Sequence, residues 1–104
     1  MGYRSEIYMK VNKSDEDELI AIFKEHDLLG EFNLQDFGDE YARYYGSHLK
    51  WYEGYKDVDA VNSFIDSSTE DNPRGLIAIG EDNAIRHFGH PDEISMGEVV
   101  QVGW

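Results

Sequence analysis

The first segment of the chain alternates between apolar and polar side chains. Along residues 3–11, Tyr3, Ser5, Ile7, Met9 and Val11 fall on one side, and the polar or charged residues between them fall on the other. A period of two with one mostly apolar side is typical of a strand that is buried on one face. The pattern therefore predicts a strand over residues 3–11.

A helix is predicted over residues 15–29. Ser14 is the expected N-cap, with Asp17 at the third helical position in capping-box spacing, and Gly30 is the expected stop. The acidic run 15–18 complements the positive end of a helix, and we prefer this structural role to a binding role. Helical spacing relates the following side chains: Leu19, Ile22, Phe23, His26 and Leu29.

Residues 31–52 are the aromatic part of the chain. Aromatic enrichment favours strands, so we expect one or two strands here, with Gly38 and Gly46 at turns or bulges. A short helix over residues 39–45 is the alternative.

The second half repeats the alternation of helix and strand. A turn over residues 53–56 leads into a helix that Asp57 caps and that runs through Ser67. The apolar run 76–79 lies between two glycines and predicts a buried central strand, which pairs with residues 84–88 in a hairpin. Residues 89–97 read as a loop and residues 98–102 as a last strand.

This order of elements predicts an α+β fold. We expect one domain over residues 1–104, with an antiparallel or mixed sheet of four to five strands and two helices on one face. A ferredoxin-like arrangement is the natural expectation.

The net charge of the chain is the property that most narrows its possible partners. Twenty-two Asp and Glu against nine Lys and Arg give a formal charge of −13, spread along the chain without a block that would read as a tail. Such an excess repels nucleic acid and anionic membranes and attracts basic protein surfaces. The nine bases form no cluster, so direct nucleic-acid binding is not expected.

Several kinds of chemistry lack their residues. The chain has no cysteine, which excludes disulfides, thiolate zinc sites and cysteine nucleophiles. No serine stands in a Gly-x-Ser-x-Gly elbow, and no glycine-rich phosphate loop occurs. Since these motifs are missing, we expect no cofactor and no enzymatic activity. No signal peptide, membrane span or myristoylation pattern is recognised, so we expect a cytoplasmic protein.

Three short stretches together resemble a family of small, acidic, uncharacterised proteins of phages and prophages. They are residues 1–6 (MGYRSE), residues 49–58 (LKWYEGYKDV) and residues 77–82 (IAIGED). The resemblance covers about residues 1–88. It implies a phage-encoded protein of α+β fold in the host cytoplasm, and it implies no activity.

One segment is a weak candidate for a metal site. Imidazole and carboxylate groups suit zinc or iron, and a His-x-x-His pair can converge on one ion from a turn. A third ligand is missing nearby, with His48 or His26 as distant options. The alternative is a hairpin end with exposed histidines. The candidate residues are His87, His90, Asp92 and Glu93.

The aromatic group is the best candidate for an interface. Tyr and Trp are favoured where proteins meet, because they combine a large apolar body with a polar group. Packing within the sheet is the competing explanation. Together with neighbouring acids, the candidate interface residues are Tyr41, Tyr44, Tyr45, Trp51, Tyr52, Tyr55, Asp36, Asp39, Glu40, Glu53 and Asp57.

Three hypotheses of function remain. The first is an interaction protein that docks on a basic protein of the host, as an inhibitor or a DNA mimic. The second is an accessory domain that associates with itself through its aromatic sheet. The third is a small metal-dependent enzyme that uses residues 87–93.

Overall fold

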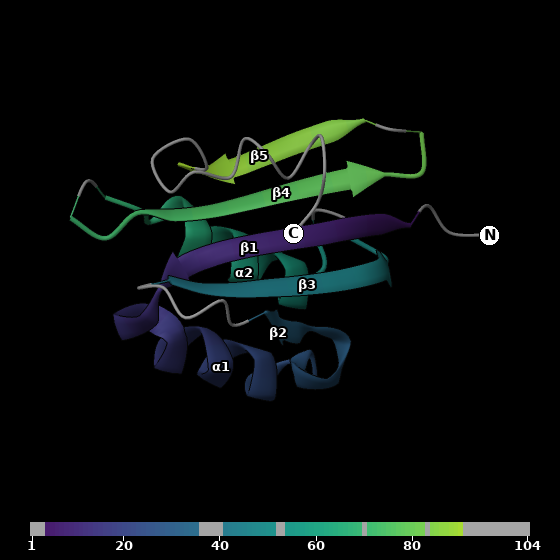
Figure 1. Ribbon diagram of the computed structural model, residues 1–104. Coiled ribbons are helices and arrows are strands. Elements are labelled where there is room, and N and C mark those ends of the chain that lie inside the picture. The colour runs from purple at the N-terminus through teal and green to yellow at the C-terminus, as the bar shows by residue number, and fades with distance from the viewer. Residues whose placement is uncertain (1–3, 36–40, 52–53, 70, 83, 91–104) are drawn as a thin grey trace.

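The structure is a computed structural model. Two helices cover one face of an open sheet (Figure 1). The α+β class predicted from the sequence is confirmed. The structure describes residues 4–35, 41–51, 54–69, 71–82 and 84–90.

The sheet has five strands, and every neighbouring pair is antiparallel. From one edge to the other its order is β2 (Asn33–Gln35), β3 (Tyr41–Leu49), β1 (Ser5–Asn12), β4 (Arg74–Gly80) and β5 (Ile85–Gly89).

The first strand therefore lies at the centre of the sheet. The order of elements from β1 to β4, β-α-β-β-α-β, is the one that a ferredoxin-like arrangement requires. The fifth strand is added at the edge beyond β4 through the expected hairpin.

The first helix is shorter than predicted. A 3-10 turn, η1 (Lys13–Asp15), precedes α1 (Glu16–Glu25), so Ser14 lies inside the turn and Asp15 holds the N-cap position without a side-chain hydrogen bond. The predicted capping box is therefore wrong, because the chain leaves the strand directly into a turn whose own backbone bonds replace a cap.

The end of α1 also differs from the prediction. Asp27, not Gly30, takes the left-handed conformation, with φ 57°. The N–H of Leu28 donates to the carbonyl of Phe23 at 2.7 Å, which is the Schellman ending of a helix. Asp is among the few residues that tolerate this conformation, and burial of Leu28 and Phe23 in the core holds it there. Gly30 lies in the following 3-10 turn, η2 (Leu29–Glu31).

The second helix, α2 (Lys56–Asp66), agrees closely with its prediction, although its cap does not. Tyr55 holds the N-cap position, and Asp57 lies in the first turn. Asp59 accepts a hydrogen bond from the N–H of Gly54 at 3.0 Å, which ties the preceding turn to the helix.

Residues 41–49 form a strand. The alternative helix over 39–45 is therefore wrong for residues 41–45, which the structure describes. The tyrosines of this segment alternate between two faces, as a strand requires. The pairing passes from Ile7 with Gly46 to Ser5 with Leu49, which leaves an extra residue on β3 and confirms the bulge expected at Gly46. Gly38 and the expected strand 98–102 lie outside the described residues. Gly89, expected in a loop, is the last residue of β5.

Both helices pack on the same face of the sheet, where the main core lies (Figure 1). The alternation along β1 predicted this face correctly: Ile7, Met9 and Val11 are fully buried. The helices and the other strands supply the remaining core side chains, among them Leu19, Phe23, Val58, Val61, Ile65, Ala42, Tyr44, Leu76 and Ala78.

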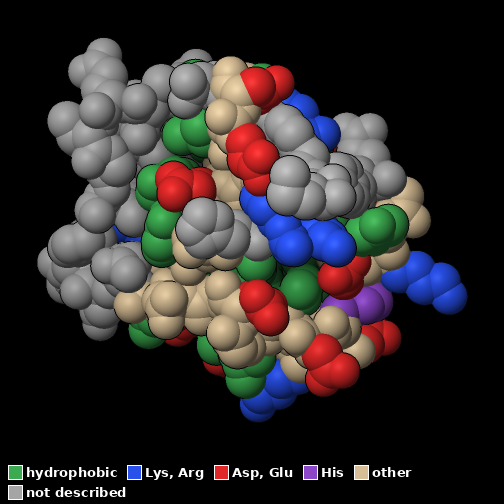
Figure 2. All heavy atoms as spheres, turned by 90° about the vertical axis from the view of Figure 1, so that its right-hand side faces the viewer, with side chains coloured by type: hydrophobic (Ala, Val, Ile, Leu, Met, Phe, Trp, Pro, Cys, Tyr) green, Lys and Arg blue, Asp and Glu red, His purple; other side chains and the backbone are tan. Residues whose placement is uncertain are grey.

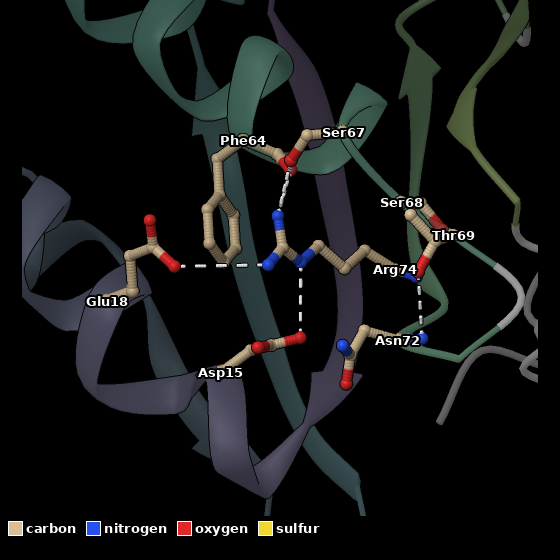
Figure 3. Close-up of polar contacts among 8 residues, drawn as sticks. All are labelled: Asp15, Glu18, Phe64, Ser67, Ser68, Thr69, Asn72 and Arg74. Carbon is tan, nitrogen blue, oxygen red and sulfur yellow. Dashed lines mark hydrogen bonds and ion pairs between the residues drawn. The ribbon is translucent and has the colours of Figure 1, made fainter.

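Arg74, at the start of β4, joins the two helices (Figure 3). Its Nε donates to Asp15 Oδ2 at 3.2 Å, and its Nη1 donates to the carbonyl of Phe64 at 2.7 Å. The guanidinium lies 4.0 Å from the centre of the Phe64 ring, and Ser67 and Glu18 complete its surroundings. Because both Arg74 and Asp15 are almost enclosed, the contact is stronger than a surface ion pair.

We expect Arg74→Met to destabilise the protein by about 2–4 kcal/mol, since it leaves Asp15, the Phe64 carbonyl of α2 and the Ser67 hydroxyl after α2 without their donor. Urea denaturation measures the loss. Lys24→Met, an exposed change on α1, is the control and should stay within about 0.5 kcal/mol. Equal effects of the two substitutions would contradict the role of Arg74.

Gly46→Ala should destabilise the fold by about 1–3 kcal/mol, because overpacking strains a closed core. An added Cβ would lie 2.7 Å from Leu49 Cδ1 and 2.9 Å from Phe32 Cε1. Gly30→Ala is the matched control, since nothing lies within 4 Å of its Cβ position. Thermal denaturation of both variants tests the difference, and an unchanged melting temperature for Gly46→Ala would refute the tight packing.

Candidate functional site

Charge is divided between the two layers of the fold. The helix-bearing segments, residues 13–31 and 56–66, contain ten Asp or Glu and three Lys. The five strands contain one acid and four bases. We call residues 13–31 and 56–66 the acidic helix layer. It faces away from the sheet, because its apolar side chains are used in the core.

The amphipathic spacing of the two helices produces this layer. Buried positions at helical spacing turn the intervening acids outward. Seven of the ten acids are exposed: Asp17, Glu18, Glu25, Asp27, Glu31, Asp59 and Asp66.

Two acids of the run 15–18 have a structural role other than the predicted one at the helix N-terminus, because they bind side chains from distant strands. Asp15 binds Arg74, and Glu16 accepts a hydrogen bond from the Tyr44 hydroxyl at 2.6 Å. Burial and the Glu16 carboxylate raise the pKa of Tyr44 well above its ordinary value. Asp17 and Glu18 are exposed. The run therefore serves both the fold and the outer surface.

The aromatic group expected at an interface is divided by the structure. Tyr44 and Trp51 lie in the core with 4% and 2% exposure, so they offer almost no surface to a partner. Tyr41 and Tyr45 lie half-buried on the sheet face opposite the helices, and Tyr55 is 49% exposed. Asp57 is described and partly exposed. The remaining expected interface residues lie outside the described part of the chain: Asp36, Asp39, Glu40, Tyr52 and Glu53.

The sheet face opposite the helices holds a second, smaller cluster that the sequence pattern missed. Tyr8 is 9% exposed, Ile77 beside it is 1% exposed, and Lys10 is 4% exposed. The Tyr8 and Tyr45 rings lie 5.0 Å apart, and the Lys10 ammonium lies 4.8 Å from the Tyr41 ring. The alternation along β1 marked this side as polar. Side chains of neighbouring strands, Tyr41, Tyr45 and Ile79, pack against this cluster, and the pattern of a single strand does not predict such neighbours.

The described residues beside the helices line two hollows. The first, of about 300 Å³, is at the end of the molecule where α1 and β3 end and α2 begins. Side chains of both signs line it, including Arg4, Lys50, Glu31 and the expected interface residue Asp57.

The second hollow, of about 380 Å³, lies between α2 and β5. Phe88 of β5 lines one side, and α2 supplies Asp59, Asn62, Ser63 and Asp66. These helix residues have the spacing i, i+3, i+4, i+7, which places them on one face. The sequence contains this spacing, but the polar face of a surface helix is ordinarily solvated, so the spacing alone does not predict a site.

The side of the molecule on which β1 begins is not uniformly acidic. Figure 2 shows Lys and Arg side chains lying among Asp and Glu side chains on this side. The acid excess of the described residues therefore belongs to the helices and does not cover the whole surface.

The expected metal site is incomplete where it is described. His87 lies in β5 and His90 follows it, and both are exposed; Asp92 and Glu93 lie outside the described residues. Within the described ranges, no three His, Asp or Glu side chains gather closely enough to hold a metal ion. The side chain of His48 is not described. In the turn after β4, Asp82 accepts a hydrogen bond from the N–H of Ala84 at 3.0 Å, as in an ordinary acidic turn.

No protein-family model, curated protein or solved structure matches the chain. The resemblance to small phage proteins therefore stays a prediction. Neither α1 nor α2 is long and apolar enough to cross a membrane, and they are the α-helices of the described residues.

Tyr44→Phe should destabilise the protein at pH 8 by about 1.5–3 kcal/mol, because a hydrogen bond to a carboxylate is lost. Burial raises the pKa of Tyr44, and it raises that of Tyr8 to about 12. The folded state therefore keeps protons that the unfolded state releases above pH 10, and stability falls as pH rises from 10.

Urea denaturation at pH 8 and pH 11 measures this pH dependence. The wild-type protein should lose more stability between the two values than Tyr44→Phe does. An identical loss in both proteins would show that Tyr44 does not contribute.

Proposed function

We propose that this protein is a binding protein whose acidic helix layer docks on a basic surface of another protein. It acts by occupying that surface and transforms no substrate. The observation that carries the proposal is the division of charge between the layers. Ten acids lie on the helix-bearing segments and seven of them are exposed, whereas the strands contain one acid and four bases, and none of these four bases is exposed.

The arrangement of bases supports a protein partner over nucleic acid. Lys10 is 4% exposed, and Arg74 is enclosed by α1 and α2. Phosphates need cations that they can reach, and binding strength follows the number of such contacts. The accessible charge of the acidic helix layer is negative on balance, with seven exposed acids against three exposed lysines.

Electrostatics gives the docking its speed and its direction. A surface with many carboxylates steers a cationic partner toward itself and raises the association rate, and salt weakens the effect. The screening length falls to about 8 Å near physiological ionic strength. A complex of this kind therefore dissociates as salt is added.

The finer form of the proposal concerns the partner. In the setting that the resemblance implies, the partner is a nucleic-acid-binding or defence enzyme of the host. Carboxylates of the acidic helix layer then take the place of DNA phosphates in its cleft. The support for this form is the charge of the helix layer together with the resemblance.

Self-association through the aromatic sheet receives less support. Tyr8 and Ile77, at the centre of that face, are already buried, and Tyr44 and Trp51 belong to the core. A second copy would gain little apolar area there, and association depends on such area.

The experiment is affinity capture of the tagged protein from lysate of its host, at low and high salt, with identification by mass spectrometry. A basic protein should be retained at low salt and released at high salt. Adding DNA should release it as well if the partner's DNA-binding cleft is the docked surface.

A matched pair of variants locates the docking surface. D17N/E25Q/D66N neutralises three exposed acids of the helix layer, and D71N/E81Q/D82N neutralises three acids outside it. The first variant should lose the partner, and the second should keep it. Retention of the partner by both variants, or absence of any basic partner at low salt, would overturn the proposal.

A further inference from the structure

We infer that the first hollow, at the end of the molecule where α1 and β3 end and α2 begins, binds a small zwitterion of the class of the large apolar amino acids. The inference goes beyond the proposed function and does not depend on it. It rests on the apolar floor of this hollow and on lining charges of both signs that do not pair with one another. The volume of about 300 Å³ is at the lower limit of pockets that bind small molecules.

Apolar side chains of the core form the floor of the hollow. Leu28, Leu49, Trp51 and Val58 line it, and their exposures are 7%, 8%, 2% and 1%. The indole of Trp51 is held in place by its hydrogen bond to Asn62. Because these side chains are already packed in the core, the floor is formed before a ligand arrives. An apolar group that covers this floor is bound favourably, since it removes apolar surface from water.

The two signs of charge come from different sides of the hollow. Ser5 pairs with Leu49, so Arg4 and Lys50 come from neighbouring strand ends of the sheet. Asp27 lies in the turn after α1, and Glu31 lies in η2. The sheet therefore supplies a positive side, and the segment after α1 supplies a negative side.

Three of these charges have no partner in the ranges that the structure describes. Asp27, Glu31 and Lys50 are exposed, and none of them forms an ion pair or a side-chain hydrogen bond with a described residue. A third acid of the hollow, Asp57, accepts the N–H of Val58 at 2.9 Å. Opposite charges thus share one hollow without joining, and each is available to a charged group of a ligand.

An α-amino acid fits both the floor and the charges. Its ammonium and carboxylate leave the same carbon, and its side chain points away from them. With the side chain on the floor, the ammonium lies toward Asp27 and Glu31 and the carboxylate toward Lys50. A charged hydrogen bond is stronger than a neutral one, so both ends contribute to binding. Tyr55, which lines the hollow and is 49% exposed, favours an aromatic side chain.

A cationic side chain of the proposed protein partner is the competing occupant. Asp27 and Glu31 would attract it, but Arg4 and Lys50 line the same hollow and would repel it. The hollow lies at the end of the molecule on which basic and acidic side chains are mixed (Figure 2). Only a ligand with both charges uses both sides of the hollow.

The test is isothermal titration calorimetry of the full-length protein with four small molecules. Phenylalanine carries both charges and an apolar side chain. Glycine lacks the side chain, 2-phenylethylamine lacks the carboxylate, and 3-phenylpropionate lacks the ammonium. Phenylalanine should bind with a Kd of about 1 mM or below, and each of the others should bind at least about tenfold more weakly.

Two pairs of variants locate the binding site, and each pair has equal changes in charge. Lys50→Met and D27N/E31Q should each weaken phenylalanine binding about tenfold. The controls Lys24→Met and D17N/E25Q, on α1 outside the hollow, should change it less than about twofold. Asn tolerates the left-handed conformation of residue 27, so the fold should persist, and circular dichroism verifies it.

Absence of phenylalanine binding, equal affinity for its singly charged analogues, or equal losses in the site and control variants would overturn the inference. The capture experiment is separate. A basic partner without amino-acid binding leaves the proposed function standing and refutes this site. Selective phenylalanine binding without a basic partner supports this site and refutes the proposed function.

Discussion

The structure depends on the burial of one face of β1 beneath both helices. Ile7, Met9 and Val11 are fully enclosed, and the neighbouring strands β3 and β4 extend the same apolar face on either side. Since α1 and α2 must both cover this face, their polar sides are forced to point the same way. The acids of two separate segments thus form one layer as a consequence of packing.

Packing also has to overcome the repulsion that such a layer creates. A chain with a formal charge of −13 resists compaction. Three internal contacts use its negative charge to stabilise the fold. Arg74 joins Asp15 to α2, Tyr44 donates to Glu16, and the N–H of Gly89 ties β5 to Asp66. Carboxylates near the start of α1 also favour its positive end.

The elements and the core could be predicted from the sequence because they depend on local periodicity. The alternation along β1 and the helical spacing in α2 placed their apolar faces correctly. The ends of the helices were harder to predict. Gly30 was the obvious stop, yet Asp27 reverses the chain because Leu28 must reach Phe23 in the core. The position of this helix end depends on tertiary packing, so the local sequence does not predict it.

The candidate site depended even more on tertiary structure. The tyrosines between residues 41 and 45 read as one aromatic group, but β3 sends Tyr44 into the core and Tyr41 and Tyr45 to the other face. Likewise, the acid excess was visible in the sequence, whereas its separation from the bases was not. The hollow beside α2 needs Phe88, which the sheet brings from a distant part of the chain.

The separation of charge between helices and sheet has a consequence for motion in solution. Among the described residues, the acidic helix layer holds ten acids and three bases and the strands one acid and four bases, so this part of the molecule carries a permanent dipole moment. In the field of a cationic surface it experiences a torque as well as an attraction, and it rotates before any atoms touch. In the proposed docking, the helices would therefore turn toward the cationic surface before contact, so fewer encounters would fail through wrong orientation.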